Sequence, residues 1–235
     1  MPRRREVSPE QLGGSIVYFP VVGIIIGLIL AGLYWLLHFV LPSAVVSVLL
    51  IICLVVLTGG LHLDGFADTC DGIAAHKTPE VRREVMRDSR AGALGVVGVC
   101  CLLIVRYVSL SSLPESLMMV TLVLMPVVGR WAMVYAIFAH PYARPSGLGK
   151  VFKQAASRRR LAIATLVALA VVIALARLPG LAVMLGVWAI VVAMAAYLRV
   201  KFSGLTGDTY GAINEVAEVS VLILVCLLAY TSGWG

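Results

Sequence analysis

Long apolar runs, separated by short polar stretches, dominate the amino-acid sequence. A helix needs about 20 mostly apolar residues to cross the roughly 30 Å hydrocarbon core of a bilayer. The pattern therefore predicts an all-α, polytopic integral membrane bundle with about seven transmembrane helices. The runs that reach helical length lie at about 17–39, 43–60, 92–110, 117–139, 160–178, 180–199 and 212–232.

Composition agrees with this pattern. The chain has 235 residues, of which 61% are hydrophobic and 13% are charged, whereas about 25% of the residues in a soluble domain are charged. No repeat or long linker divides the sequence, so residues 1–235 form a single predicted domain. The five cysteines show no CxxC or Cys/His spacing, which disfavours a zinc site or a disulfide framework.

Basic residues predict the orientation in the membrane. The N-terminal segment 1–14, with arginines at positions 3–5, and the segments 61–91 and 140–159 are rich in lysine and arginine. Two alternate connections, "HFVLPSA" and "SLSSLPESL", contain neither, and Arg177 is the exception. The positive-inside rule then places the N-terminus in the cytoplasm. Topology thus explains the net charge of +7, and nucleic acid is not an expected partner.

A cluster of acids follows the second apolar run, in "GGLHLDGFADTCDG". Asp64, Asp68 and Asp71 are spaced i, i+4 and i+7, which places them on one face of a helix. Three neighbouring carboxylates repel unless a cation neutralises them, and hard oxygen ligands favour Mg²⁺ over zinc. The alternative is a solvated polar loop, which does not account for the flanking glycines. His62 is a candidate base or phosphate contact, or else an interfacial polar residue.

Arginines next to glycine-rich helix starts predict anion contacts. Arg87, Asp88 and Arg90 lie in "VMRDSRAGALG", just before the third apolar run. Guanidinium groups and free backbone amides at a helix N-terminus both favour phosphate, although simple anchoring at the membrane surface would explain some of these cations. Arg144, in "HPYARPSGLGK", is a further candidate, with ordinary loop chemistry as an equal rival.

Ionisable residues also occur inside the apolar runs. Asp208 precedes the last run in "TGDTYGAINEVAE", and Glu215 and Glu218 form an i, i+3 pair within it. Charged groups inside a membrane span are costly and indicate function by default. Arg130, halfway along the fourth run, is expected to pair with a carboxylate in the bundle. Arg106 is expected to extend toward the outer surface.

The motifs "GGLHLDGFADTCDG", "VMRDSRAGALG" and "TGDTYGAINEVAE", in this order, resemble the cobalamin synthase family, the adenosylcobinamide-GDP ribazoletransferases of cobalamin biosynthesis. The resemblance implies a multi-pass enzyme of the bacterial inner (cytoplasmic) membrane, dependent on Mg²⁺, with its active site facing the cytoplasm. It implies a phosphotransferase reaction that joins adenosylcobinamide-GDP to α-ribazole, or to its 5′-phosphate, and releases GMP. The implied partners are these small molecules and membrane lipid. A homo-oligomer or association with other enzymes of the pathway stays open.

The resemblance also implies roles for particular residues. Asp64, Asp68 and Asp71 match an aspartate-rich motif, similar in logic to that of the CDP-alcohol phosphotransferases, whose carboxylates hold metals that bind a pyrophosphate. One of the three would instead be the base for the ribazole 3′-hydroxyl. The family usually begins with a longer, partly apolar segment, so either the start of this sequence is truncated or that longer segment is dispensable. The remaining matches to polar motifs are Arg87, Asp88, Arg90, Arg130, Asp208, Glu215 and Glu218.

Other functions remain as alternatives. A CDP-alcohol phosphotransferase that makes phospholipid would carry a longer aspartate motif than this chain has. A cation-coupled transporter would place acids near the bilayer midplane and on both faces. Here eleven of the twelve acidic residues are expected on the cytoplasmic side or just inside it. A non-catalytic membrane scaffold could coexist with catalysis.

Overall fold

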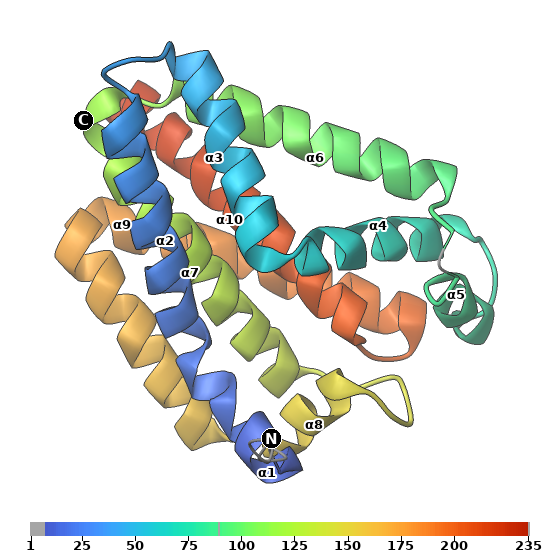
Figure 1. Ribbon diagram of the computed structural model, residues 1–235. Coiled ribbons are helices and arrows are strands. Elements are labelled where there is room, and N and C mark those ends of the chain that lie inside the picture. The colour runs from blue at the N-terminus through green and yellow to red at the C-terminus, as the bar shows by residue number, and fades with distance from the viewer. Residues whose placement is uncertain (1–7, 89, 235) are drawn as a thin grey trace, which may run out of the picture.

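The computed structural model describes residues 8–88 and 90–234, and these residues are helical almost throughout, with no β-strand (Figure 1). The arginines at positions 3–5 lie outside the described residues. The elements are α1 (Pro9–Gly14), η1 (Ser15–Tyr18), α2 (Phe19–Leu37), α3 (Ser43–Thr58), α4 (Leu61–Ala74), α5 (Pro79–Val85), α6 (Ala93–Ser112), α7 (Glu115–Ala139), α8 (Leu148–Ala155), α9 (Arg158–Phe202) and α10 (Gly207–Ser232).

Helix α7 is the centre of the bundle and packs against α2, α9 and α10. In its most apolar 18-residue window 89% of the residues are buried, whereas in α9 only 22% are. Glycines on α2 allow this packing: a Cβ at Gly27 would lie 2.6 Å from the Cα of Val123, on α7. Since the outer helices keep large apolar side chains exposed, the surface suits a hydrocarbon solvent. The predicted all-α membrane bundle is therefore confirmed.

The number of spans depends on how two bent elements are counted. Among residues 8–88 and 90–234, five helices are long and apolar enough to cross a membrane, or six if α3 and α4 form one broken span. The 45-residue α9 contains Arg177 with non-helical dihedral angles (φ 48°, ψ −132°). A Cβ at Gly180 would lie 2.9 Å from the Val172 carbonyl oxygen, so the chain folds back here. The runs 160–178 and 180–199, predicted as separate spans, are the two arms of α9.

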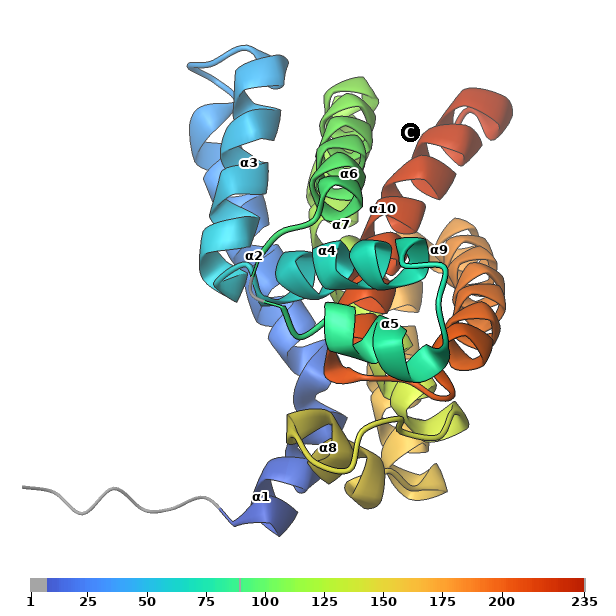
Figure 2. The same cartoon turned by 90° about the vertical axis from the view of Figure 1, so that its right-hand side faces the viewer.

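A sharp turn sets α4 apart from the upright helices. Gly59 and Gly60 both have positive φ angles, 60° and 69°, which glycine adopts without steric cost. At this turn the axis bends by 91° between α3 and α4, and α4 then crosses α10 and packs against α6 (Figure 2). The segment 61–91, predicted to be a catalytic loop with helix ends, thus contains two helices, α4 and α5.

Candidate functional site

Helix α4 lies in direct backbone contact with the start of α10. A Cβ at Gly65 would lie 2.8 Å from the Asp208 carbonyl oxygen, and one at Gly211 would lie 3.1 Å from the Cα of His62. These glycines let the two helices approach more closely than side chains would permit. The acidic motif on α4 and the one at the start of α10 are therefore neighbours in space, although about 140 residues separate them in the sequence.

Local hydrogen bonds fix the start of α10. The Thr206 hydroxyl accepts a hydrogen bond from the Thr209 amide at 3.2 Å, and the Thr206 amide donates to the Thr209 hydroxyl at 2.7 Å. This reciprocal cap holds Asp208 in the first turn. The loop before α8 is tied to the same place, because the Ala143 amide donates to the Leu205 carbonyl oxygen at 2.8 Å. Arg144 is thereby brought to Asp208.

Carboxylates outnumber cations where these elements meet. The Arg144 guanidinium donates to Oδ2 of Asp208 at 2.6 Å. Burial, followed by the nearby carboxylates of Asp64 and Asp208, raises the pKa of Asp68 to about 7, and Arg144 opposes this effect only in part. Like charges held together disfavour ionisation unless a cation joins them. The carboxylates of this cluster therefore disfavour one another's ionisation.

Asp71 serves a different purpose from the other two aspartates of α4. Its carboxylate accepts hydrogen bonds from the Gly92 amide at 2.9 Å and from the Gly95 amide at 2.8 Å. It thus caps the N-terminus of α6, where backbone amides lack partners within the helix. Within residues 8–88 and 90–234, no three His, Cys, Asp or Glu side chains are grouped as metal ligands. The predicted site of three aspartates is not assembled in this arrangement.

The arginines of the second motif separate into two environments. Arg87 lines the cavity described below, together with Arg144. Arg90 instead donates to Asp88 at 2.7 Å, and its side chain is 87% exposed. This hydrogen bond lowers the pKa of Asp88 to about 2. Of the two arginines in this motif, Arg87 is therefore the one placed on the cavity wall.

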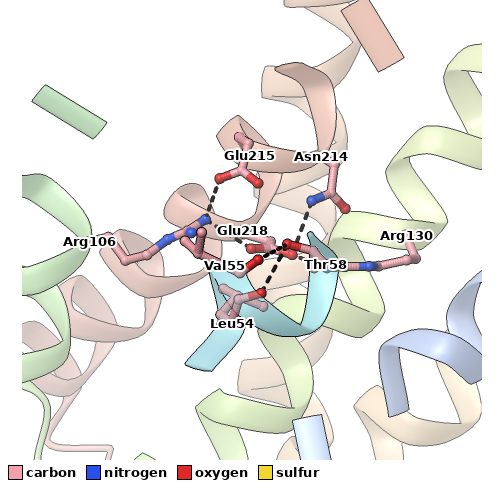
Figure 3. Close-up of polar contacts among 8 residues, drawn as sticks. All are labelled: Leu54, Val55, Thr58, Arg106, Arg130, Asn214, Glu215 and Glu218. Carbon is pink, nitrogen blue, oxygen red and sulfur yellow. Dashed lines mark hydrogen bonds and ion pairs between the residues drawn. The ribbon is translucent and has the colours of Figure 1, made fainter. Parts of the chain in front are cut away.

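A second charged cluster lies deeper between the helices (Figure 3). Arg106 donates to both Glu215 and Glu218 at 2.9 Å, and Arg130 pairs with Glu218 from the opposite side. Asn214 adds a hydrogen bond to Glu218 at 3.1 Å. The predicted pairing of Arg130 with a carboxylate in the bundle is therefore confirmed.

The prediction that Arg106 extends to the outer surface is wrong. Its side chain is 1% exposed, since α6 packs beside α10 and turns Arg106 toward the two glutamates. Position along a span indicates the depth of a residue, but the partner is set by the neighbouring helix.

Many of these groups line one cavity of about 700 Å³. It lies between α2, α7, α8 and the first turns of α4 and α10. Tyr142 and Tyr210 also line it, and sequence reasoning did not select them. Their positions within the glycine-rich motifs "HPYARPSG" and "TGDTYGA" were the available signal. The predicted site residues on its wall are His62, Asp64, Arg87, Arg130, Arg144 and Asp208.

His62 stands between the cavity and the deeper ion pairs. Burial, followed by the neighbouring Arg130, lowers the pKa of its imidazole to about 4. The ring is therefore neutral near pH 7, and its Nδ1 has no hydrogen-bond partner among the described residues. A neutral imidazole can accept a proton or a hydrogen bond from a ligand.

Comparison with known proteins places the chain in a family. Its sequence matches the cobalamin-5-phosphate synthase family over residues 1–226. The adenosylcobinamide-GDP ribazoletransferase of Desulforamulus reducens is 38% identical over 219 residues, which cover 93% of this chain and 88% of that protein. The enzyme of the same name from Roseiflexus sp. is 36% identical over 229 residues, covering 97% and 85%. No solved structure matches. The chain belongs to the cobalamin-5-phosphate synthase family.

Proposed function

We propose that the protein is an adenosylcobinamide-GDP ribazoletransferase, which joins adenosylcobinamide-GDP to α-ribazole or its 5′-phosphate and releases GMP. Relatives that match nearly the whole chain carry this name. The observation that carries the proposal is the cavity whose wall carries both acids, Asp64 and Asp208, and two arginines, Arg87 and Arg144. Phosphoryl transfer requires anion-binding guanidiniums and carboxylates in one place.

Magnesium fits the surplus of carboxylates in this cluster. Mg²⁺ is commonly bound by one or two carboxylates together with substrate phosphates, and seldom by a complete cage of protein ligands. Asp64 and Asp68 on α4, with Asp208 adjacent, would hold it, whereas Asp71 is occupied by the amides of α6. Bound there, the metal would neutralise charge on the pyrophosphate.

The chain's own groups then account for the remaining chemistry. Arg87 and Arg144 bind the phosphates and orient the pyrophosphate in the cavity. The ribazole hydroxyl oxygen forms a bond to the phosphorus on the cobinamide side. The bond from that phosphorus to the oxygen shared with GMP breaks, and GMP leaves with the electron pair. The hydroxyl proton passes to one of the two carboxylates on the cavity wall, Asp64 or Asp208.

The proposed location is the bacterial inner membrane, with the cavity facing the cytoplasm. Apolar helices support the membrane assignment, and the concentration of lysine and arginine in 61–91 and 140–159 supports the orientation. Both segments border the cavity, because Arg87 and Arg144 lie on its wall. A nucleotide-linked substrate made in the cytoplasm would then reach the site without crossing the bilayer.

The test is GMP release by the purified protein in lipid nanodiscs, given adenosylcobinamide-GDP, α-ribazole 5′-phosphate and Mg²⁺. We expect GMP and a cobalamin product only when metal and acceptor are both present, with EDTA and omission of the acceptor as controls. Glu80→Gln, at an exposed acid of α5, is a matched control for substitutions in the acidic cluster. Turnover of a CDP-alcohol in place of the corrinoid would overturn the proposal.

A further inference from the structure

The cavity has two chemically different ends. Asp64, Arg87, Arg144 and Asp208 form a charged end beside α4 and the start of α10. The cavity also reaches α8, through Leu148, Gly149 and Phe152, and α8 lies well apart from α4 in the bundle (Figure 2). We call the apolar side chains Phe19, Val22, Ile26, Met133, Ile137 and Phe152 of the cavity wall the uncharged end, and Arg130 lines the cavity one turn of α7 from Met133. A ligand that fills both ends must itself be half charged and half apolar.

Aromatic rings shape the uncharged part of the wall. Phe19 on α2 and Phe152 on α8 form an edge-to-face pair, with ring centroids 5.3 Å apart. Tyr142 and Tyr210 form a second, stacked pair at 6.3 Å, nearer to the charged end. Aromatic walls of this kind favour a planar, apolar ring system, which can stack on one ring and meet the edge of another.

Two buried polar atoms lie on the wall without partners. Tyr210 is 4% exposed, and its hydroxyl has no hydrogen-bond partner among the described residues. The same holds for Nδ1 of His62, on the neighbouring turn of α4. Leaving such groups unsatisfied is costly, so they suit a ligand that supplies hydroxyl groups between its apolar part and its charged part.

We propose that the uncharged end is the acceptor subsite, in which the aromatic base of α-ribazole packs against Phe19 and Phe152. Its ribose hydroxyls then bond to the Tyr210 hydroxyl and to Nδ1 of His62. This inference rests on the proposed function, which supplies the identity of the acceptor. With the base held at this end, the ribose lies between the aromatic wall and the carboxylates, where its hydroxyl can meet the pyrophosphate.

The other parts of the two substrates fit this end less well. Guanine presents several polar edge groups, and the uncharged end offers no charged or amide side chain to satisfy them. A corrin ring with its peripheral amides is much larger than the drug-sized ligands that cavities of roughly 300–1,000 Å³ enclose. A nucleoside with an apolar bicyclic base agrees with both the volume and the chemistry.

The experiment measures KM for each substrate separately in Phe152→Ala and Tyr210→Phe. We expect the KM for α-ribazole 5′-phosphate to rise about 10-fold in Phe152→Ala and about 2- to 10-fold in Tyr210→Phe. The KM for adenosylcobinamide-GDP should stay within about 2-fold of the wild-type value. Matched controls are Phe39→Ala and Tyr230→Phe, whose aromatic side chains are 73% and 92% exposed.

A binding measurement separates this inference from the proposed function. α-Ribazole alone is titrated into the wild type and both variants, and binding is followed by intrinsic fluorescence. Both variants should bind it more weakly than the wild type does, in the same order as their KM values and without any turnover. If the wild type releases GMP while the variants bind ribazole normally, the subsite is wrong and the function stands. A rise in KM for adenosylcobinamide-GDP alone would assign this end to the corrinoid nucleotide. Altered dependence on lipid with unchanged ribazole KM would assign it to an acyl chain.

Discussion

Two clusters of charged side chains lie within a few turns of each other along α10, one buried and one partly exposed, and they are balanced in opposite ways. Around Glu218, two arginines and Asn214 satisfy the carboxylate, and both ion-pair partners are at most 3% exposed. At Asp68, burial and the carboxylates of Asp64, Asp208 and Asp71 raise the pKa, and Arg144 is the group that lowers it. In the first cluster two arginines balance two glutamates, whereas in the second the carboxylates outnumber the cation that acts on Asp68.

This difference separates stability from chemistry. A buried ion pair is costly to break, because the surviving partner stays buried without its counter-charge. In a cluster that is short of positive charge, ionisation of each carboxyl group is disfavoured until a cation lies beside it. Glu215 and Glu218, which sequence reasoning grouped with the substrate-binding residues, therefore act first in holding α6, α7 and α10 together. The same pairing disfavours their use as an ion pathway.

The largest effect is expected for Glu218→Gln, which removes the shared carboxylate between Arg106 and Arg130. The free energy of unfolding should fall by about 3–5 kcal/mol, since both guanidiniums remain buried. Thermal or denaturant unfolding in detergent measures this loss. Glu115→Gln, at a side chain 79% exposed, is the control. Equal stability of the two variants would contradict a structural role for the Glu218 cluster.

Next in size is Asp68→Asn, which keeps the volume of the side chain and removes one charge of the open cluster. We expect GMP release to fall by about 10²- to 10³-fold, because the site loses electrostatic stabilisation of the reacting phosphates. The melting temperature should not fall, since repulsion with Asp64 and Asp208 is relieved. The variant is assayed for turnover over a range of Mg²⁺ concentrations. Normal turnover would remove Asp68 from the site.

Two arginines only three positions apart sharpen the comparison further. Arg87→Gln should raise the KM for adenosylcobinamide-GDP about 10-fold, because a charged hydrogen bond to phosphate is lost. Arg90→Gln should leave it within about 2-fold, since that exposed side chain pairs with Asp88 away from the cavity wall. The steady-state kinetics of both variants decide this. A larger effect at position 90 would mean that the loop rearranges around the substrate.

The smallest effect is expected for Asp71→Asn. An amide has one acceptor oxygen in place of two, so one of the bonds from Gly92 and Gly95 is lost, at about 1 kcal/mol of stability. The Mg²⁺ concentration needed for half-maximal GMP release should not change. A shifted requirement for Mg²⁺ would return Asp71 to the metal site and contradict its role as a helix cap.

Much of the architecture could be predicted from the sequence. The length of the apolar runs predicts the helices, because backbone groups in hydrocarbon must be satisfied within the chain. The spacing of Asp64, Asp68 and Asp71 predicts a helix with one acidic face, and α4 is that helix. Two consecutive glycines come before this helix, and both adopt positive φ angles at the turn. These features depend on local chemistry, which a sequence displays directly.

The tertiary structure decided which charges meet. Asp64 and Asp71 share a helical face but lie about 10 Å apart along the axis, at 1.5 Å per residue, so the first reaches the cavity and the second reaches α6. The sequence gives Arg106 a depth in the membrane, and only the packing of α6 on α10 supplies its two glutamates. Partners across helices depend on rotation and contact between distant segments, and no local pattern specifies these.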